Sequence, residues 1–148
     1  MKYSFEIFAD YFAFIVQDEN ANADFSNVTD LTIENMIDVQ TDAINITTAR
    51  DFTVPVSIEV LESAPTDTND DSDRINECSI HVPSGTLVVH GNEYFPDAPR
   101  ITVTPGTYAV RVYYKGLHTI VNDGQNGDDS YHLVLWPTQE SLPYRRIK

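Results

Sequence analysis

Two short stretches of the chain concentrate carboxylates at spacings that could bind a cation. In residues 67–73, Asp or Asn side chains alternate in the pattern D-x-[DN]-x-[DN] of calcium-binding loops. Calcium takes roughly six to eight oxygen ligands, and an EF-hand loop needs Gly at its sixth position and Glu at its twelfth. Ser72 and Cys78 stand at those positions. The stretch therefore predicts an acidic loop between strands rather than an EF-type site.

The second stretch, residues 122–129, has three carboxylates and two glycines that permit tight turns. Its carboxylates could hold a cation between them, but the composition is equally that of a loop joining two strands. We expect the two stretches to form one anionic surface if they share an end of the fold. This surface, here called the acidic rim, comprises Asp67, Asp70, Asp71, Asp73, Asp123, Asp128 and Asp129.

The charge balance of the whole chain supports a basic partner for such a surface. Nine Lys and Arg residues stand against 23 Asp and Glu residues, which gives a formal net charge of −14. A surface of this sign repels nucleic acid and anionic membranes and attracts basic proteins. We therefore expect a basic protein as partner, and neither nucleic acid nor a membrane.

The remaining reactive side chains show no catalytic or metal-binding pattern. The four histidines lie in separate segments without metal-ligand spacing, and His81 and His132 occupy outward positions of predicted strands. No Gly-x-Ser-x-Gly elbow, phosphate-binding loop or His-Glu-x-x-His motif is present. The sequence predicts a protein that is not an enzyme and uses no cofactor or metal.

Alternating apolar residues predict the elements that must position the acidic loops. Segments with a period of two, separated by turn signals, predict about eight or nine short strands, clearest in residues 52–61, 74–82 and 130–136. Two-layer burial follows from such a pattern. We expect an all-β fold in a single domain, residues 1–148: an antiparallel two-layer β-sandwich, jelly-roll-like, with one short helix near residues 30–39.

Three local features refine this prediction. The pattern of residues 2–17 changes at Asp10, which indicates a bulge or bend where the chain moves from one sheet to the other. Pro55 lacks a backbone N–H, so its strand should lie at an edge or carry a bulge there. Thr29 or Asp30 should cap the helix, which we expect to extend to about Val39.

Residues 94–114 read as strand, Pro105-Gly106 turn and strand, which predicts a hairpin. Arg100 and Arg111 flank the turn. In an acidic protein, cations on strands are most simply ion-pair partners. If the two side chains lie exposed together, however, the hairpin itself becomes a candidate site.

Cellular location is constrained only by indirect features. Cys78 is the one cysteine and lies in an alternating apolar stretch, so we expect it to be buried and reduced. The first residues lack a signal-peptide pattern, and no stretch approaches the roughly 20 apolar residues of a membrane helix. A cytoplasmic location is the expectation.

Four motifs in the second half of the chain are similar to those of a family of uncharacterised bacterial β-sandwich proteins. The segments that carry this resemblance have the pattern PSG…PDAPRI…PGTYAVRVYYKGL…DGQNGDDSYHLVLWP, at Pro83–Gly85, Pro96–Ile101, Pro105–Leu117 and Asp123–Pro137.

The order of elements also resembles the competence protein J family, small inhibitors of the nuclease that acts during DNA uptake. The matching features are a strand ending in Gln-Asp, a short helix, Thr-x-Arg, a Val-x-Val strand and Pro-Gly-x-Tyr, at Tyr11–Asp18, Asp30–Val39, Thr48–Arg50, Val54–Val60 and Pro105–Tyr108. The acidic loop at 67–73 and the long segment after Tyr114 depart from that family.

The resemblance implies an acidic protein that sequesters a basic nuclease. Together with the charge of the chain, it favours a non-catalytic inhibitor or immunity-type protein. The alternative is a Ca²⁺-dependent or small-ligand-binding β-sandwich module.

Overall fold

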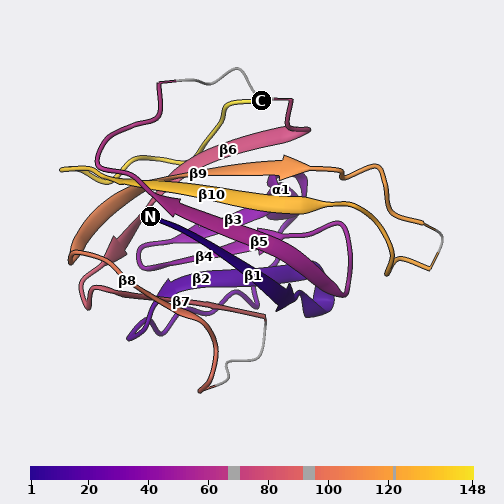
Figure 1. The fold of residues 1–148 in the computed structure, drawn as a ribbon, viewed down its shortest axis with the longest axis horizontal. Helices are drawn as coiled ribbons and strands as arrows, with labels where there is room; N and C mark the ends of the chain where they lie inside the picture. Colours follow the sequence, from indigo (N-terminus) through magenta and orange to yellow (C-terminus); the bar gives the residue numbers. More distant parts are fainter. Residues whose placement is uncertain (67–70, 92–95, 122) are drawn as a thin grey trace.

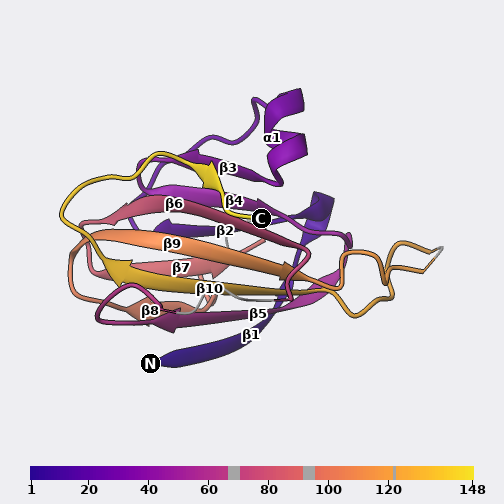
Figure 2. The same ribbon diagram turned by 90° about the horizontal axis from the view of Figure 1, so that it is seen from above.

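The computed structural model describes residues 1–66, 71–91, 96–121 and 123–148, which fold into two packed β-sheets (Figures 1 and 2). Asp67 and Asp70 of the acidic rim lie outside these residues. The larger sheet has the order β1 (Lys2–Phe8), β5 (Thr53–Val60), β10 (Ser130–Pro137), β9 (Gly106–Lys115), β6 (Arg74–Val82) and β11 (Arg145–Arg146). The smaller sheet has the order β3 (Ile37–Gln40), β4 (Ala43–Thr47), β2 (Ala13–Asp18), β7 (Thr86–His90) and β8 (Arg100–Thr102). The predicted all-β sandwich with one short helix is confirmed.

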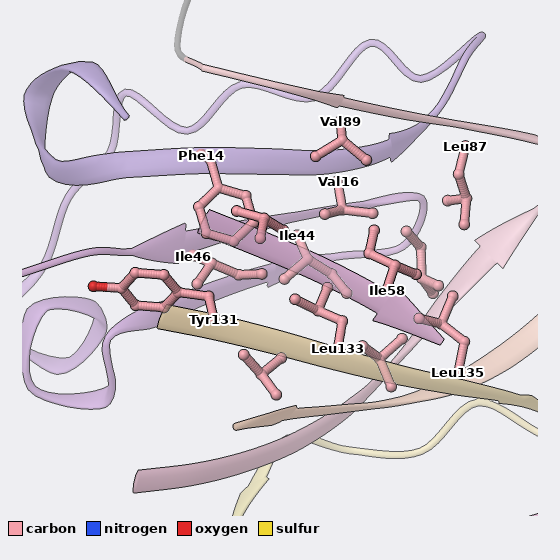
Figure 3. Close-up of a cluster of buried hydrophobic side chains, with 14 of the residues drawn as sticks. Phe14, Val16, Ile44, Ile46, Ile58, Leu87, Val89, Tyr131, Leu133 and Leu135 are labelled. Carbon is pink, nitrogen blue, oxygen red and sulfur yellow. The ribbon is translucent and has the colours of Figure 1, made fainter. Parts of the chain in front are cut away.

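Alternating apolar side chains of both sheets meet between the layers and form the main core (Figure 3). In β5, Ile58 is fully buried while its neighbours in sequence are half-buried, as the period of two requires. Aromatic rings close one end of this core, where Tyr131 packs edge-to-face against Phe14 and Tyr114 with 5.8 Å between ring centroids in each pair. Cys78 is buried in the same core, as predicted.

The chain changes sheet at Asp10, as the sequence predicts. β1 belongs to the larger sheet and β2 to the smaller, and a single 3₁₀ turn, η1 (Asp10–Phe12), joins them. Backbone bonds fasten both sides of the turn: Ala9 N donates to Phe52 O at 2.9 Å, and Thr48 N donates to Phe12 O at 2.8 Å. β1, η1 and β2 therefore connect the two sheets at this end.

The predicted hairpin at residues 94–114 is wrong in its pairing. β8 pairs with β7 in the smaller sheet, whereas β9 pairs with β10 and β6 in the larger one. Pro105-Gly106 carries the chain between the layers instead of turning one strand back along the other. Strand alternation does not distinguish these two outcomes, because both bury the same residues.

All strand pairs among the described residues are antiparallel except β5 with β10, which is parallel. β5 is not an edge strand, contrary to one of the two readings of Pro55. Its ladder with β10 begins at Val56, so Pro55 has strand pairing only with β1, opposite Glu6. The missing N–H is tolerated because the residue lies just outside one of the two ladders.

The helix is shorter than predicted. α1 (Asp30–Asn35) begins with a capping box in which Thr29 and Thr32 satisfy each other's backbone N–H groups. It ends at Met36, which has a left-handed φ of 58°, and β3 follows at once. No helix among the described residues is long and apolar enough to cross a membrane.

Candidate partner-binding end of the sandwich

One end of the sandwich brings together four connecting segments, of which the structure describes residues 9–12, 48–52, 71–73, 115–121 and 123–129. β1, β4 and β9 end there, and β2, β5, β6 and β10 begin there. In Figure 2 this end is on the right, where the orange loop after β9 extends furthest. We call it the acidic end.

The two acidic stretches meet at this end, as far as the described residues show. Asp71 forms an ion pair with Lys115 at 2.8 Å, and Asp73 Oδ2 accepts a hydrogen bond from Leu117 N at 2.9 Å. Both partners belong to the end of β9 or the loop that follows it. Lys115 lowers the pKa of Asp71 by hydrogen bonding and by its charge. Asp71 and Asp73 therefore lie at the same end of the sandwich as the loop of the second stretch.

The loop of the second stretch is shaped by its own side chains. Asp123 Oδ1 accepts hydrogen bonds from the backbone N–H groups of Gln125 and Asn126, which lowers the pKa of this carboxyl. At the base of the loop Gly116 has φ +70°, and a Cβ there would lie 2.4 Å from Asp128 O. Asp123 and Asp128 are exposed, so both present charge to solvent at the acidic end.

Asp129 lies in the interior, away from the acidic rim on which the sequence places it. It is fully buried, forms an ion pair with Arg50 at 2.5 Å and accepts a hydrogen bond from Tyr131 OH at 2.6 Å. Tyr131 OH in turn accepts from Ala49 N at 2.7 Å. Burial and the adjacent Asp129 raise the pKa of Tyr131. Asp129 thus anchors the acidic loop to segment 48–52 and is inaccessible to a partner.

Arg100 and Arg111 do not form a common site. Arg100 is exposed in the smaller sheet and donates to backbone carbonyls of its own loop. Arg111 is buried on the outer face of the larger sheet, where it pairs with Glu77 at 2.8 Å and lies 5.3 Å from the ring centroid of Trp136. Glu77 also binds Arg145 at 2.9 Å, so this cluster fastens the C-terminal segment to the sheet.

Exposed aromatic side chains also lie at the acidic end. Tyr11 is 81% exposed and Phe12 45%, and both have left-handed backbones with φ of 57° and 62°. Only a few per cent of non-glycine residues adopt this region, and such strain marks candidate functional positions. Phe8 and Phe52, also exposed, pack edge-to-face beside them with centroids 6.4 Å apart.

A groove of about 230 Å³ begins at Tyr11 and Phe12 and runs over the outer face of the smaller sheet. Its walls are apolar and include Ile33 of α1. Its floor includes Asp38 and Asn45, which are directly opposite each other in the β3–β4 ladder. The buried Asn45 Oδ1 has no hydrogen-bond partner among the described residues. Desolvation raises the pKa of Asp38, against a smaller opposing effect of its hydrogen bond with Val39.

A third arrangement lies on the outer face of the larger sheet. Ser57 Oγ lies 2.6 Å from His132 Nδ1, and His132 Nε2 lies 3.5 Å from Glu59 Oε1. The three side chains are half-exposed around an open hollow of about 370 Å³ that Ser57 and His132 line. His132 and Ser57 are register partners, so His132 makes a cross-strand contact from an outward strand position. His81 makes another such contact, approaching Thr107 Oγ1 at 3.0 Å across the β6–β9 ladder.

No three His, Cys, Asp or Glu side chains in the described ranges converge into a group that could hold a metal ion. At the acidic end, the oxygens of Asp71 and Asp73 are engaged by Lys115 and a backbone N–H rather than directed at one point. Chemically, the acidic end presents exposed carboxylates and exposed aromatic rings to solvent.

The fold is similar to that of two solved structures. ComJ from Bacillus subtilis, described as an inhibitor of the DNA-degrading activity of NucA, matches with a TM-score of 0.69 at 15% identity, over 93% of this chain and 99% of that one. A protein described as crocagin biosynthetic gene J matches with a TM-score of 0.64 at 18% identity, over 94% and 98%. No family model matches the chain, and no curated protein does. The chain has the fold of ComJ, in agreement with the resemblance of its order of elements to the competence protein J family.

Proposed function

We propose that this chain is a non-catalytic inhibitor or immunity-type protein that sequesters a basic nuclease. The observation that carries the proposal is the acidic end of the sandwich, where the strand topology places exposed aspartates and exposed aromatic rings. The similarity of the whole fold to an inhibitor of a nuclease supports the choice of partner. A single buried cysteine fits the reducing cytoplasm in which we propose that it acts.

The physical basis of the proposal is charge complementarity. A nuclease binds the phosphates of DNA with basic side chains, and carboxylates held at fixed positions can occupy the same track. Asp71, Asp73, Asp123 and Asp128 are the exposed rim members among the described residues, and Lys115 is the cation that contacts one of them. A net charge of −14 also accelerates the encounter with a basic protein at low salt.

The exposed aromatic residues supply binding energy that the exposed carboxylates alone do not. Exposed ion pairs contribute only about 0–1 kcal/mol each. The exposed aspartates should therefore increase the rate of association more than they stabilise the complex. Tyr and Trp dominate the energetically important positions of protein interfaces. Tyr11 and Phe12, which are exposed at the same end of the sandwich, are the side chains that we expect to bury against the partner.

The test is affinity capture from the lysate of the source organism on the immobilised chain at low salt. We expect a basic protein with nuclease activity, released at about 0.5 M salt, where surface charges are screened. A matched variant carrying Asp71→Asn, Asp123→Asn and Asp128→Asn has three fewer charges and the same shape. Capture of no basic protein, or equal capture by both resins, would overturn the proposal.

A further inference from the structure

The groove beside Tyr11 and Phe12 has the chemistry of a receptor for one long cationic side chain. At about 230 Å³ it is smaller than the roughly 300–1,000 Å³ of small-molecule sites, so it suits a side chain rather than a whole ligand. Its apolar walls can receive a hydrocarbon stem. None of the described residues that line it is basic.

Two side chains with oxygen acceptors, on neighbouring strands, line the floor of the groove. Asp38 on β3 and Asn45 on β4 are opposite each other in register and both line the groove. Asn45 Oδ1 is buried and has no hydrogen-bond partner among the described residues, an arrangement that is rare because a buried acceptor without a donor is unfavourable. Its side chain must rotate toward the groove for a donor to reach this oxygen. Asp38 is half-buried, and its desolvation disfavours the charged form in the unbound protein. A hydrogen-bond donor that entered the groove would stabilise both the Asp38 carboxylate and the Asn45 carbonyl oxygen.

The rings at the mouth of the groove favour a planar cation. Tyr11 and Phe12 line it and are exposed, so their faces are available to a partner. A guanidinium group stacks on aromatic rings and donates from a rigid fork that can reach two acceptors at once. A lysine ammonium is a point charge without that fork and fits the paired acceptors less well.

We propose that this groove binds an arginine side chain of the basic protein partner, with the guanidinium on Asp38 and Asn45 and its stem against Tyr11 and Phe12. The inference rests on the proposed function for the class of partner, and it adds the residue of that partner that is recognised. The acidic rim then steers the partner, and the groove fixes the orientation in which it docks.

The experiment uses a peptide, so that it does not depend on finding the nuclease. The full chain, labelled with ¹⁵N, is titrated with acetyl-Ala-Arg-Ala-amide and with the same peptide carrying citrulline, which keeps the shape and removes the charge. We expect saturable shifts of the Tyr11, Phe12 and Asp38 amides and of the Asn45 side-chain amide, with a Kd in roughly the millimolar range. The citrulline peptide should bind at least about tenfold more weakly, since it lacks the charge-assisted bonds.

Two variants make the assignment specific. Asp38→Asn should reduce the preference for arginine over citrulline to near one, while Tyr11→Gly should weaken both peptides. Equal binding of the two peptides by the unaltered chain, shifts confined to residues 116–129, or no saturation up to about 20 mM would overturn the inference. Capture of a basic nuclease without peptide binding would refute the groove alone, and the reverse result would refute the proposed inhibitor role alone.

Discussion

The left-handed backbone at Tyr11 provides a direct test of the surface on which the functional proposal depends. Replacing Tyr11 with Gly or with Ala removes the same ring, but the two residues differ in how they tolerate φ of 57°. A left-handed conformation costs an L-residue about 1–2 kcal/mol, whereas Gly adopts it freely and loses about 0.5–1 kcal/mol in additional chain entropy on folding. Tyr11→Gly should therefore be more stable than Tyr11→Ala by about 0.5–1 kcal/mol.

The loss of the ring itself should affect stability little. The side chain is 81% exposed, and the backbone N–H keeps its 2.7 Å bond to Asp51 Oδ1 in either variant. For a chain of this size 1 kcal/mol shifts the midpoint by roughly 2–4 °C, so calorimetry should show Tyr11→Gly about 1–4 °C above Tyr11→Ala. Phe52, exposed but without a positive φ, is the control, since there Ala should be the more stable replacement. A Tyr11→Ala variant as stable as Tyr11→Gly would refute the reasoning, because it would mean that position 11 carries no backbone strain.

Three further outcomes follow from the buried and half-buried polar groups. Asp129→Ala leaves Arg50 buried without its carboxylate and should destabilise the fold by about 3–5 kcal/mol, whereas a midpoint drop under about 3 °C by calorimetry would contradict this. Because desolvation raises the folded-state pKa of Asp38, its stabilising contribution is complete below the ordinary pKa of Asp and is lost as pH rises through the raised value. Asp38→Asn should thus raise the melting midpoint at pH 7 and lose this advantage near pH 3, and a gain that persists at acid pH would count against it. Ser57, whose hydroxyl touches His132, should remain unlabelled by a fluorophosphonate, and labelling that Ser57→Ala abolishes would show a nucleophile where we infer none.

Local sequence patterns predict most of the sheet but not the connections between its strands. The alternation of β5 and β10 and the change of sheet at Asp10 are readable from the sequence, since each depends on the burial of neighbouring residues. The partner of β9 is not, because the same alternation satisfies a hairpin and a crossover between layers. The C-terminal end of α1 cannot be predicted from the local sequence pattern either, because Met36 adopts a left-handed cap conformation that is more typical of Gly or Asn.

The candidate site, too, is only partly predictable from the sequence. Charge density identifies the rim, but composition cannot separate the exposed Asp128 from the buried Asp129 one residue later. That difference arises from Arg50, which lies far away in sequence and approaches only when β4 and β10 are in place. The groove has no sequence signature, because its floor comes from three strands and its walls from α1 and η1.

The proposed inhibition of a basic nuclease is tested most directly by the rate at which the nuclease recovered on the immobilised chain degrades DNA. We expect the unaltered chain to stop degradation at a near-stoichiometric ratio, and the triple variant of Asp71, Asp123 and Asp128 to require a substantially higher concentration at low salt. The difference between the two should shrink as salt screens the exposed carboxylates. If the recovered nuclease degrades DNA at the same rate with and without the chain, the chain is not its inhibitor. If the variant inhibits as well as the unaltered protein, the exposed aspartates are not part of the inhibitory surface.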